Sequence, residues 1–142
     1  MQLPCIFLQI RKADRQLNHL YGKFLARKGM RMTQYGLLRA IAGLEEPSIT
    51  EIGRVLGIDQ TTVTRNVEKL EKLGLVTNIQ APADSRKKIM QLTTLGTNSL
   101  KEAHPSWEEA QQLMISELGD DDAQELLRLL TKVSRIVEKD SA

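Results

Sequence analysis

The sequence has few of the features that mark secreted and membrane proteins. It contains one cysteine among 142 residues, so no internal disulfide can form, and this favours a reducing compartment. No apolar run approaches the ~20 residues needed to span a bilayer. The N-terminus lacks the basic, apolar and small-residue segments of a signal peptide. We therefore expect a soluble cytoplasmic protein that does not enter a membrane.

Motifs of catalysis and metal binding are missing as well. The two histidines, His19 and His104, do not form a closely spaced pair, and no cluster of cysteine and histidine accompanies them. No glycine-rich phosphate loop, nucleophile elbow or paired-carboxylate motif occurs. The sequence therefore predicts neither an enzyme nor a resident metal or cofactor.

The composition is that of a globular domain, and its charge is unevenly distributed. Hydrophobic residues make up 41% and charged residues 27% of the chain, which excludes a disordered polymer. Residues 1–100 hold 15 Lys or Arg against 8 Asp or Glu, whereas residues 101–142 hold 5 against 10. The first part therefore has a charge of +7 and the second −5, which suggests a basic half that faces a polyanion. Two solvated helix faces are the alternative interpretation.

Long apolar stripes occur near both ends of the chain. After Pro4, suited to a first helical turn, the first stripe recurs every three or four residues until Gly29: Ile6, Ile10, Ala13, Leu17, Leu20, Tyr21 and Phe24. A helix from Thr94 to Leu118, kinked or interrupted near Pro105, precedes Gly119. The last helix carries the second stripe: Ala123, Leu126, Leu127, Leu130, Val133 and Val137. Two such stripes exceed what a lobe of about 65 residues can cover, so a dimer interface is favoured over a monomer core.

Three shorter helices and a hairpin are predicted between these segments. Thr33 is expected to cap a helix that closes at residues 45–47, Ser48 one that stops at Gly57, and Asp59 one that reaches Lys72. Residues 75–80 and 88–93 are rich in β-branched and apolar side chains. The segment between them contains the turn formers Pro82, Asp84 and Ser85. Arg86 and Lys87, with Lys88 at the start of the second strand, give the hairpin a basic tip.

The helix that follows Asp59 begins with an unusual number of threonines. Thr61, Thr62 and Thr64 are poor helix formers, so stability does not explain them. When residues 59–73 are wound at ~100° per residue, Val63, Val67 and Leu70 fall on one side. The opposite side carries Thr61, Arg65, Lys69 and Lys72, with Thr62 and Thr64 at its margins. Hydroxyls followed by basic groups suit the phosphates and base edges of DNA, whereas a solvated, locally capped helix is the alternative.

A short helix, a tight turn, a basic helix and a basic hairpin follow one another in the order of a winged helix-turn-helix. In three segments, "RMTQYGLLRAI", "SITEIGRVLGIDQTTVTRNVEKLEKLGLV" and "DSRKKIMQLTTLG", the chain resembles the multiple antibiotic resistance regulator (MarR) family. The most specific part contains Asp84, Arg86, Leu92 and Thr93. The fold expected from the resemblance is mainly α with a small β-hairpin wing, in one protomer of residues 1–142. Residues 31–94 would form the DNA-binding lobe, and residues 1–30 and 95–142 the dimerisation helices.

The resemblance also implies a function. Family members are usually homodimeric, ligand-responsive repressors that bind double-stranded DNA at a pseudo-palindromic operator. The implied DNA contacts are Gln60, Thr61, Thr62, Thr64, Arg65, Lys69, Arg86, Lys87 and Lys88, with Asp84 bracing the wing. A small aromatic or phenolic effector would bind between the dimer helices and the lobe, near Arg15, His19, Tyr21 and Trp107.

Cys5 leads to an alternative function. A branch of the family similar to this chain at "PCIF" senses organic peroxides through a cysteine in the first helix, although Gln9 stands here where that branch usually has tyrosine. A thiol peroxidase would need a resolving thiol or an active-site scaffold, and neither is visible. A winged helix used for protein contacts is a further alternative, but it would not need the basic, threonine-rich face.

Overall fold

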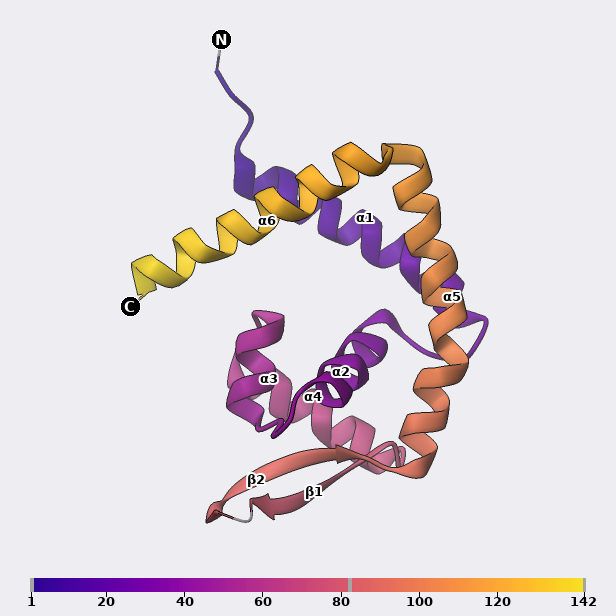
Figure 1. Cartoon of the computed structure of the whole chain (residues 1–142), viewed down its shortest axis with the longest axis vertical. Helices are drawn as coiled ribbons and strands as arrows, with labels where there is room; N and C mark the ends of the chain where they lie inside the picture. The colour runs from indigo at the N-terminus through magenta and orange to yellow at the C-terminus, as the bar shows by residue number, and fades with distance from the viewer. Residues whose placement is uncertain (1, 82, 142) are drawn as a thin grey trace. The chain divides into compact units, whose positions relative to one another are not determined.

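The computed structural model describes residues 2–81 and 83–141, which fold mainly into helices. The elements along these residues are α1 (Ile6–Ala26), α2 (Met32–Gly43), α3 (Ile49–Leu56), α4 (Gln60–Lys72), β1 (Val76–Ala81), β2 (Asp84–Leu92), α5 (Thr94–Leu118) and α6 (Asp120–Ser141) (Figure 1). The predicted combination of helices with one β-hairpin is confirmed.

The chain divides into two compact units, Met1–Trp107 and Glu108–Ala142, and α5 starts in the first and ends in the second. In the first unit, α2, α3 and α4 pack on one another and on the hairpin (Figure 1). The largest of the fully buried side chains in this core are Leu25, Tyr35, Leu38, Ile52, Val63, Val67 and Leu70. The burial of one face of each helix stabilises the arrangement, because apolar area leaves water there.

Side-chain caps and glycines set the ends of the short helices. The Ser48 hydroxyl accepts a 3.2 Å hydrogen bond from the Glu51 N–H at the start of α3, and Gly57 ends that helix with φ of 68°, as predicted. The prediction that Thr33 caps α2 was wrong. The capping residue is Arg31, whose N–H donates to Gln34 Oε1 at 2.9 Å, so the helix begins before Thr33.

The hairpin is longer on its second strand than the sequence indicated. Strands β1 and β2 are antiparallel, with Val76 opposite Leu92 and Gln80 opposite Lys88. Strand β2 starts at Asp84, so Arg86, Lys87 and Lys88 belong to a strand and not to the turn. The predicted turn former Pro82 lies outside the described residues. The Met90 N–H donates to the Pro47 carbonyl at 2.8 Å and thereby ties the hairpin to the segment before α3.

Helix α5 continues through Pro105, so the predicted interruption was wrong. Pro105 cannot donate to the carbonyl four residues earlier, but a helix of 25 residues tolerates one missing hydrogen bond. In the second unit, Gly119 with φ of 87° separates α5 from α6, as predicted. Side chains on α6 remain exposed although they are apolar: Leu126, Leu127, Leu129, Leu130, Val133, Ile136 and Val137. None of the described helices has the length and apolarity required to cross a membrane.

Candidate nucleic-acid interface

Helix α4 starts from a doubly bonded cap. The carboxylate of Asp59 accepts a 2.7 Å hydrogen bond from the Thr62 hydroxyl and a 3.1 Å bond from the Thr62 N–H. These two bonds, with a smaller contribution from the positive charge of Arg65, hold the pKa of Asp59 below its ordinary value. The cap orients the first turn of α4, where unpaired backbone N–H groups favour a negatively charged ligand.

We expect Asp59→Asn to lower the melting temperature at neutral pH, because asparagine has one oxygen for two donors. Since the pKa of Asp59 is lowered in the folded state, its carboxylate stabilises the fold above the unfolded pKa of about 3.9. That stability is lost as the pH falls through the lowered value. Thermal unfolding of both proteins can be followed from neutral to acidic pH. The melting temperatures of the wild type and of Asp59→Asn should therefore converge below about pH 4. A difference in melting temperature that stays constant across this pH range would contradict a role for the ionised cap.

The two faces of α4 differ as the helical winding predicted. Val63, Val67 and Leu70 are buried in the first unit, with at most 2% of each residue exposed. The exposed face carries Thr61, Thr64, Arg65, Lys69 and Lys72. Because the buried face anchors the helix, the exposed face is presented as a rigid surface of hydroxyl, guanidinium and ammonium groups.

Two of the predicted contact residues are already engaged within the protein. Thr62 is half-buried and its hydroxyl belongs to the Asp59 cap. The side-chain amide of Gln60 donates to the Thr50 hydroxyl at 3.0 Å, which joins the start of α4 to α3. Both residues orient the helix, and the sequence pattern alone did not distinguish this role from contact with a ligand.

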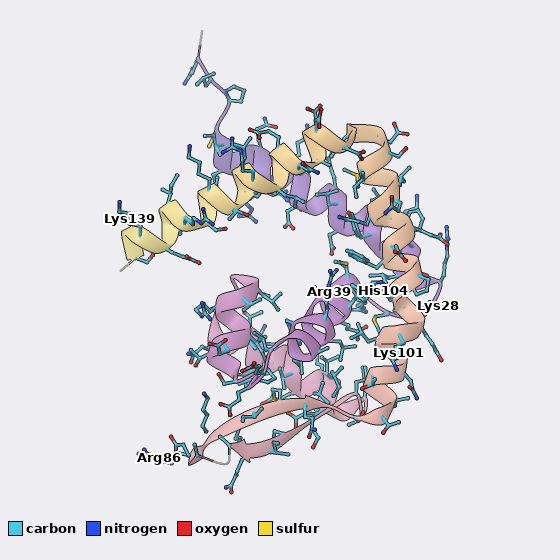
Figure 2. The ribbon with its side chains drawn as sticks, viewed as in Figure 1. Lys28, Arg39, Arg86, Lys101, His104 and Lys139 are labelled. Atoms are coloured by element: carbon cyan, nitrogen blue, oxygen red, sulfur yellow. The ribbon has the colours of Figure 1, made fainter. Side chains whose placement is uncertain are left out.

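Strand β2 presents a second basic surface. The Arg86 N–H and Nε both donate to Asp84 Oδ1, at 3.0 and 3.4 Å, so Asp84 braces this arginine. The side chain of Arg86 is nevertheless 91% exposed, and Figure 2 shows it at the outer end of the hairpin. Lys87 and Lys88 are exposed as well. Alternation along the strand places Arg86 and Lys88 on one face and Lys87 on the other.

Trp107 belongs to an aromatic and basic cluster that the sequence analysis did not identify. Its ring stacks with those of His104 and Tyr35, at centroid separations of 5.4 and 6.0 Å, and the guanidinium of Arg39 lies 4.2 Å from its centroid. His104 Nδ1 lies 3.0 Å from the Tyr35 hydroxyl. Arg39 on α2 and His104 on α5, both labelled in Figure 2, line the same cavity. The only available sequence signal was the helical spacing within each pair, Tyr35 with Arg39 and His104 with Trp107.

The other predicted effector residues lie on α1. Arg15 and His19 are exposed there, and Tyr21 is half-buried, with burial raising the pKa of its hydroxyl. Cys5 is exposed at the N-terminal end of α1. Across residues 2–81 and 83–141, no three side chains of His, Cys, Asp or Glu gather to form a possible metal site.

Comparison with known proteins matches part of the chain to a family model. Residues 28–87 match the model of the MarR family. The chain is 23% identical, over 90% of its length and 88% of the relative, to the HTH-type transcriptional regulator MhqR of Bacillus subtilis. Its fold is similar to that of the M. tuberculosis regulator MosR in complex with DNA, with a TM-score of 0.87, 29% identity, and coverage of 98% of this chain and 100% of MosR.

The fold is also similar to that of CouR from Rhodococcus jostii bound to p-coumaroyl-CoA. Here the TM-score is 0.80 at 20% identity, with 91% of each chain covered. The residues that match the family contain α2, α3, α4, β1 and the start of β2. Residues 28–87 thus match the MarR family, and the proteins to which the chain is similar over most of its length are transcriptional regulators.

Proposed function

We propose that this regulator is a homodimeric repressor that binds a pseudo-palindromic duplex site. The observation that carries the proposal is the exposed face of α4, where Thr61, Thr64, Arg65 and Lys69 lie opposite a buried anchor. Threonine hydroxyls bond phosphates or base edges, their methyl groups meet thymine methyls, and Arg65 can reach guanine with two hydrogen bonds. This combination suits the major groove better than it suits another protein.

The hairpin would extend the contact beyond the major groove. Arg86 is exposed at its outer end and held by Asp84, so its guanidinium can enter a flanking minor groove at low entropic cost. Lys87 and Lys88 would contact phosphates, which supply affinity without sequence information.

Two lobes would be needed to read a pseudo-palindrome. The apolar side chains that α1 and α6 expose to water support pairing with a second copy, because a surface of this kind is normally covered by a partner. In such a dimer, two copies of α4 would enter successive major grooves about 34 Å apart. An effector would then weaken binding by favouring a dimer with a different separation.

Selection of DNA by the purified protein tests this function. Duplex fragments retained from the region upstream of its own gene should share one pseudo-palindromic sequence. With roughly six to ten phosphates contacted, the affinity should fall by about 10³- to 10⁵-fold between about 50 and 200 mM salt. Retention of unrelated fragments with little dependence on salt would contradict the proposal.

Dimerisation is expected to depend on the apolar side of α6. The double substitution Leu126→Glu and Leu130→Glu should shift the mass measured by light scattering from twice the 16.0 kDa of one chain toward a single chain, since it would bury four carboxylates in the interface. Gln124→Glu adds one carboxylate on another side of α6 and should leave the mass unchanged. Equal masses for the wild-type and doubly substituted proteins would exclude this part of α6 from the interface.

We further propose that a small aromatic or phenolic compound is the effector. The p-coumaroyl-CoA bound to the similar CouR structure supports this class of ligand. In the present chain, a cavity of about 330 Å³ lies beside the Trp107 cluster and is lined in part by Tyr35, Arg39 and His104, which offer an aromatic face and a cation. Peroxide sensing by Cys5 remains the alternative switch; exposure of its thiol is compatible with it.

A further inference from the structure

A second groove lies in the first unit, between the C-terminal half of α2, strand β2 and the start of α5. Its volume is about 630 Å³, within the usual range for sites that bind small molecules. The walls are formed mainly by aliphatic side chains, among them Ile41, Leu44, Ile89, Leu92 and Leu100. Among the residues that the structure describes, no aromatic side chain lines the groove, which distinguishes it from the cavity beside Trp107 and favours an aliphatic ligand.

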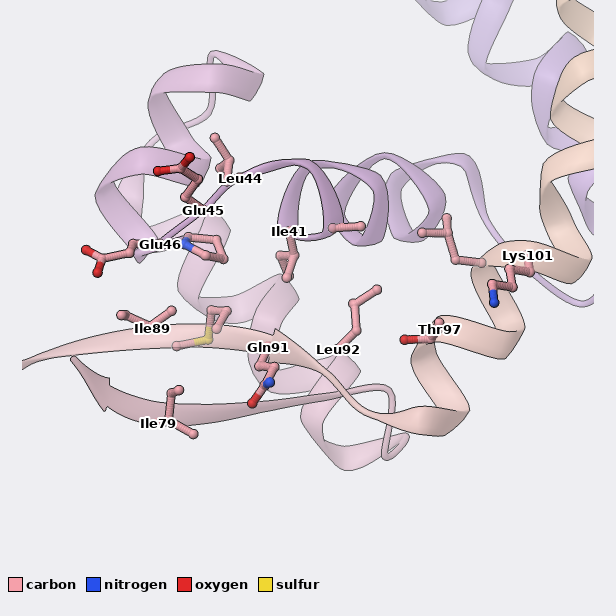
Figure 3. Close-up of a pocket in the computed structure, with 14 residues that line it drawn as sticks. Ile41, Leu44, Glu45, Glu46, Ile79, Ile89, Gln91, Leu92, Thr97 and Lys101 are labelled. Carbon is pink, nitrogen blue, oxygen red and sulfur yellow. The ribbon is translucent and has the colours of Figure 1, made fainter. Parts of the chain in front are cut away.

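The charged groups stand at opposite ends of this groove. Lys101 and Thr97, one helical turn apart on α5, lie at one end, and Figure 3 shows their polar atoms directed toward the apolar walls. Glu45 and Glu46 lie at the other end with their carboxylates pointing away from the walls (Figure 3). Within the described residues, Lys101 forms no ion pair, so its ammonium is available to an anion.

The geometry points to a binding site for a medium-chain aliphatic monocarboxylate. Its carboxylate would bind Lys101 Nζ and the Thr97 hydroxyl, and its chain would lie along β2 from Leu92 to Ile89, a distance of about 10 Å at the rise of a strand. Glu45 and Glu46 would repel a second carboxylate at the far end. This site goes beyond the proposed function, because it is separate from the surface of α4 and ligand binding there does not require DNA. It adjoins the cavity beside Trp107, with which it shares Leu100 and Lys101, but its aliphatic walls on α2 and β2 are its own.

A ligand in this groove would contact the hairpin that carries Arg86. Ile89 and Met90 line the groove on the strand that also carries Arg86, and the Met90 N–H donates to the carbonyl of Pro47, which lines the groove as well. A ligand in the groove would therefore contact α2, the hairpin and α5 at once, and would restrict movement of the hairpin relative to the helices.

Decanoate is a suitable probe, with decylammonium and decanedioate as matched controls of the same chain length. With isoleucine methyl groups labelled for NMR, decanoate should shift the signals of Ile41 and Ile89, and the titration should give its dissociation constant. Decylammonium and decanedioate should bind at least about tenfold more weakly, because each places a repelled charge at one end.

Substitutions locate the charged end of the site. Lys101→Met keeps most of the apolar stem and should weaken decanoate binding by about tenfold or more, whereas Lys101→Arg should retain it. Lys139→Met removes an exposed lysine from α6, and Arg39→Met alters the Trp107 cluster; both should bind decanoate like the wild type. Equal binding of decanoate and decylammonium, unchanged binding by Lys101→Met, or shifts confined to Ile6 and Ile136 would overturn the proposal.

Discussion

Replacement of Arg65 and Arg86 by alanine in the same chain is expected to abolish sequence-specific DNA binding. Each arginine that contacts a base or a narrow minor groove contributes about 1–3 kcal/mol of discrimination. A dimer would lose four such contacts, so the affinity for the selected site should fall at least about a thousandfold. The fold should persist, because both side chains are exposed and neither packs in the core.

A gel shift at fixed salt measures this loss, and circular dichroism confirms that the variant still unfolds at the wild-type temperature. Arg128→Ala with Arg135→Ala removes the same charge from α6 and provides the control. If the control lost as much affinity as the Arg65 and Arg86 variant, net charge and not the position of the guanidinium groups would explain binding. Undiminished binding by the Arg65 and Arg86 variant would exclude both residues from the interface.

Gly96→Ala is expected to be the most destabilising substitution of a single glycine. Gly96 lies at the start of α5 against the backbone of Leu75, where an added Cβ would overlap the carbonyl oxygen and approach the carbonyl carbon to 2.9 Å. The same junction contains a 2.6 Å bond from the Thr93 hydroxyl to the Gly74 carbonyl, and the Thr93 N–H donates to Leu75 O at 3.1 Å. Since the backbone cannot move without loss of these bonds, overpacking should lower the free energy of unfolding by about 3 kcal/mol or more.

Thermal unfolding should show this as a decrease in melting temperature of roughly 10 °C. Gly36→Ala is the matched control, because Gly36 lies within α2 and a Cβ there would meet no atom within 4 Å. That control should be neutral or stabilising by up to about 1 kcal/mol, since alanine is the better helix former. A Gly96→Ala protein as stable as the wild type would mean that α5 is not locked to Leu75.

The parts of the fold that depend on local chemistry could be predicted from the sequence. Asp59 and Ser48 cap their helices because a short side-chain oxygen reaches the N–H three residues on, whatever the rest of the protein does. The faces of α4 follow from helical periodicity, and Val67 and Arg65 are accordingly on opposite sides. The prediction for α2 was wrong because either Thr33 or Arg31 could stand at the start of the helix. The structure has Arg31 there, with its N–H donating to Gln34 Oε1.

The parts that depend on contacts between distant segments could not be predicted. Tyr35 and His104 are 69 residues apart, and nothing in either local pattern indicates that α2 and α5 bring them together. The aliphatic groove has the same origin, because Ile41 and Leu100 each look like ordinary core residues. The role of Gln60 was also hidden, since an exposed amide near a helix start can bind DNA or, as here, the neighbouring Thr50.

Site-directed DNA cleavage tests the central claim most directly. Cys5→Ser removes the single cysteine, and Thr61→Cys then provides one thiol at the start of α4 for a tethered iron chelate. Hydroxyl radicals from the chelate should cut the selected duplex in two clusters about one helical turn apart, related by the two-fold symmetry of the site. A single cluster, or no cleavage despite binding, would contradict the claim that paired copies of α4 occupy successive major grooves.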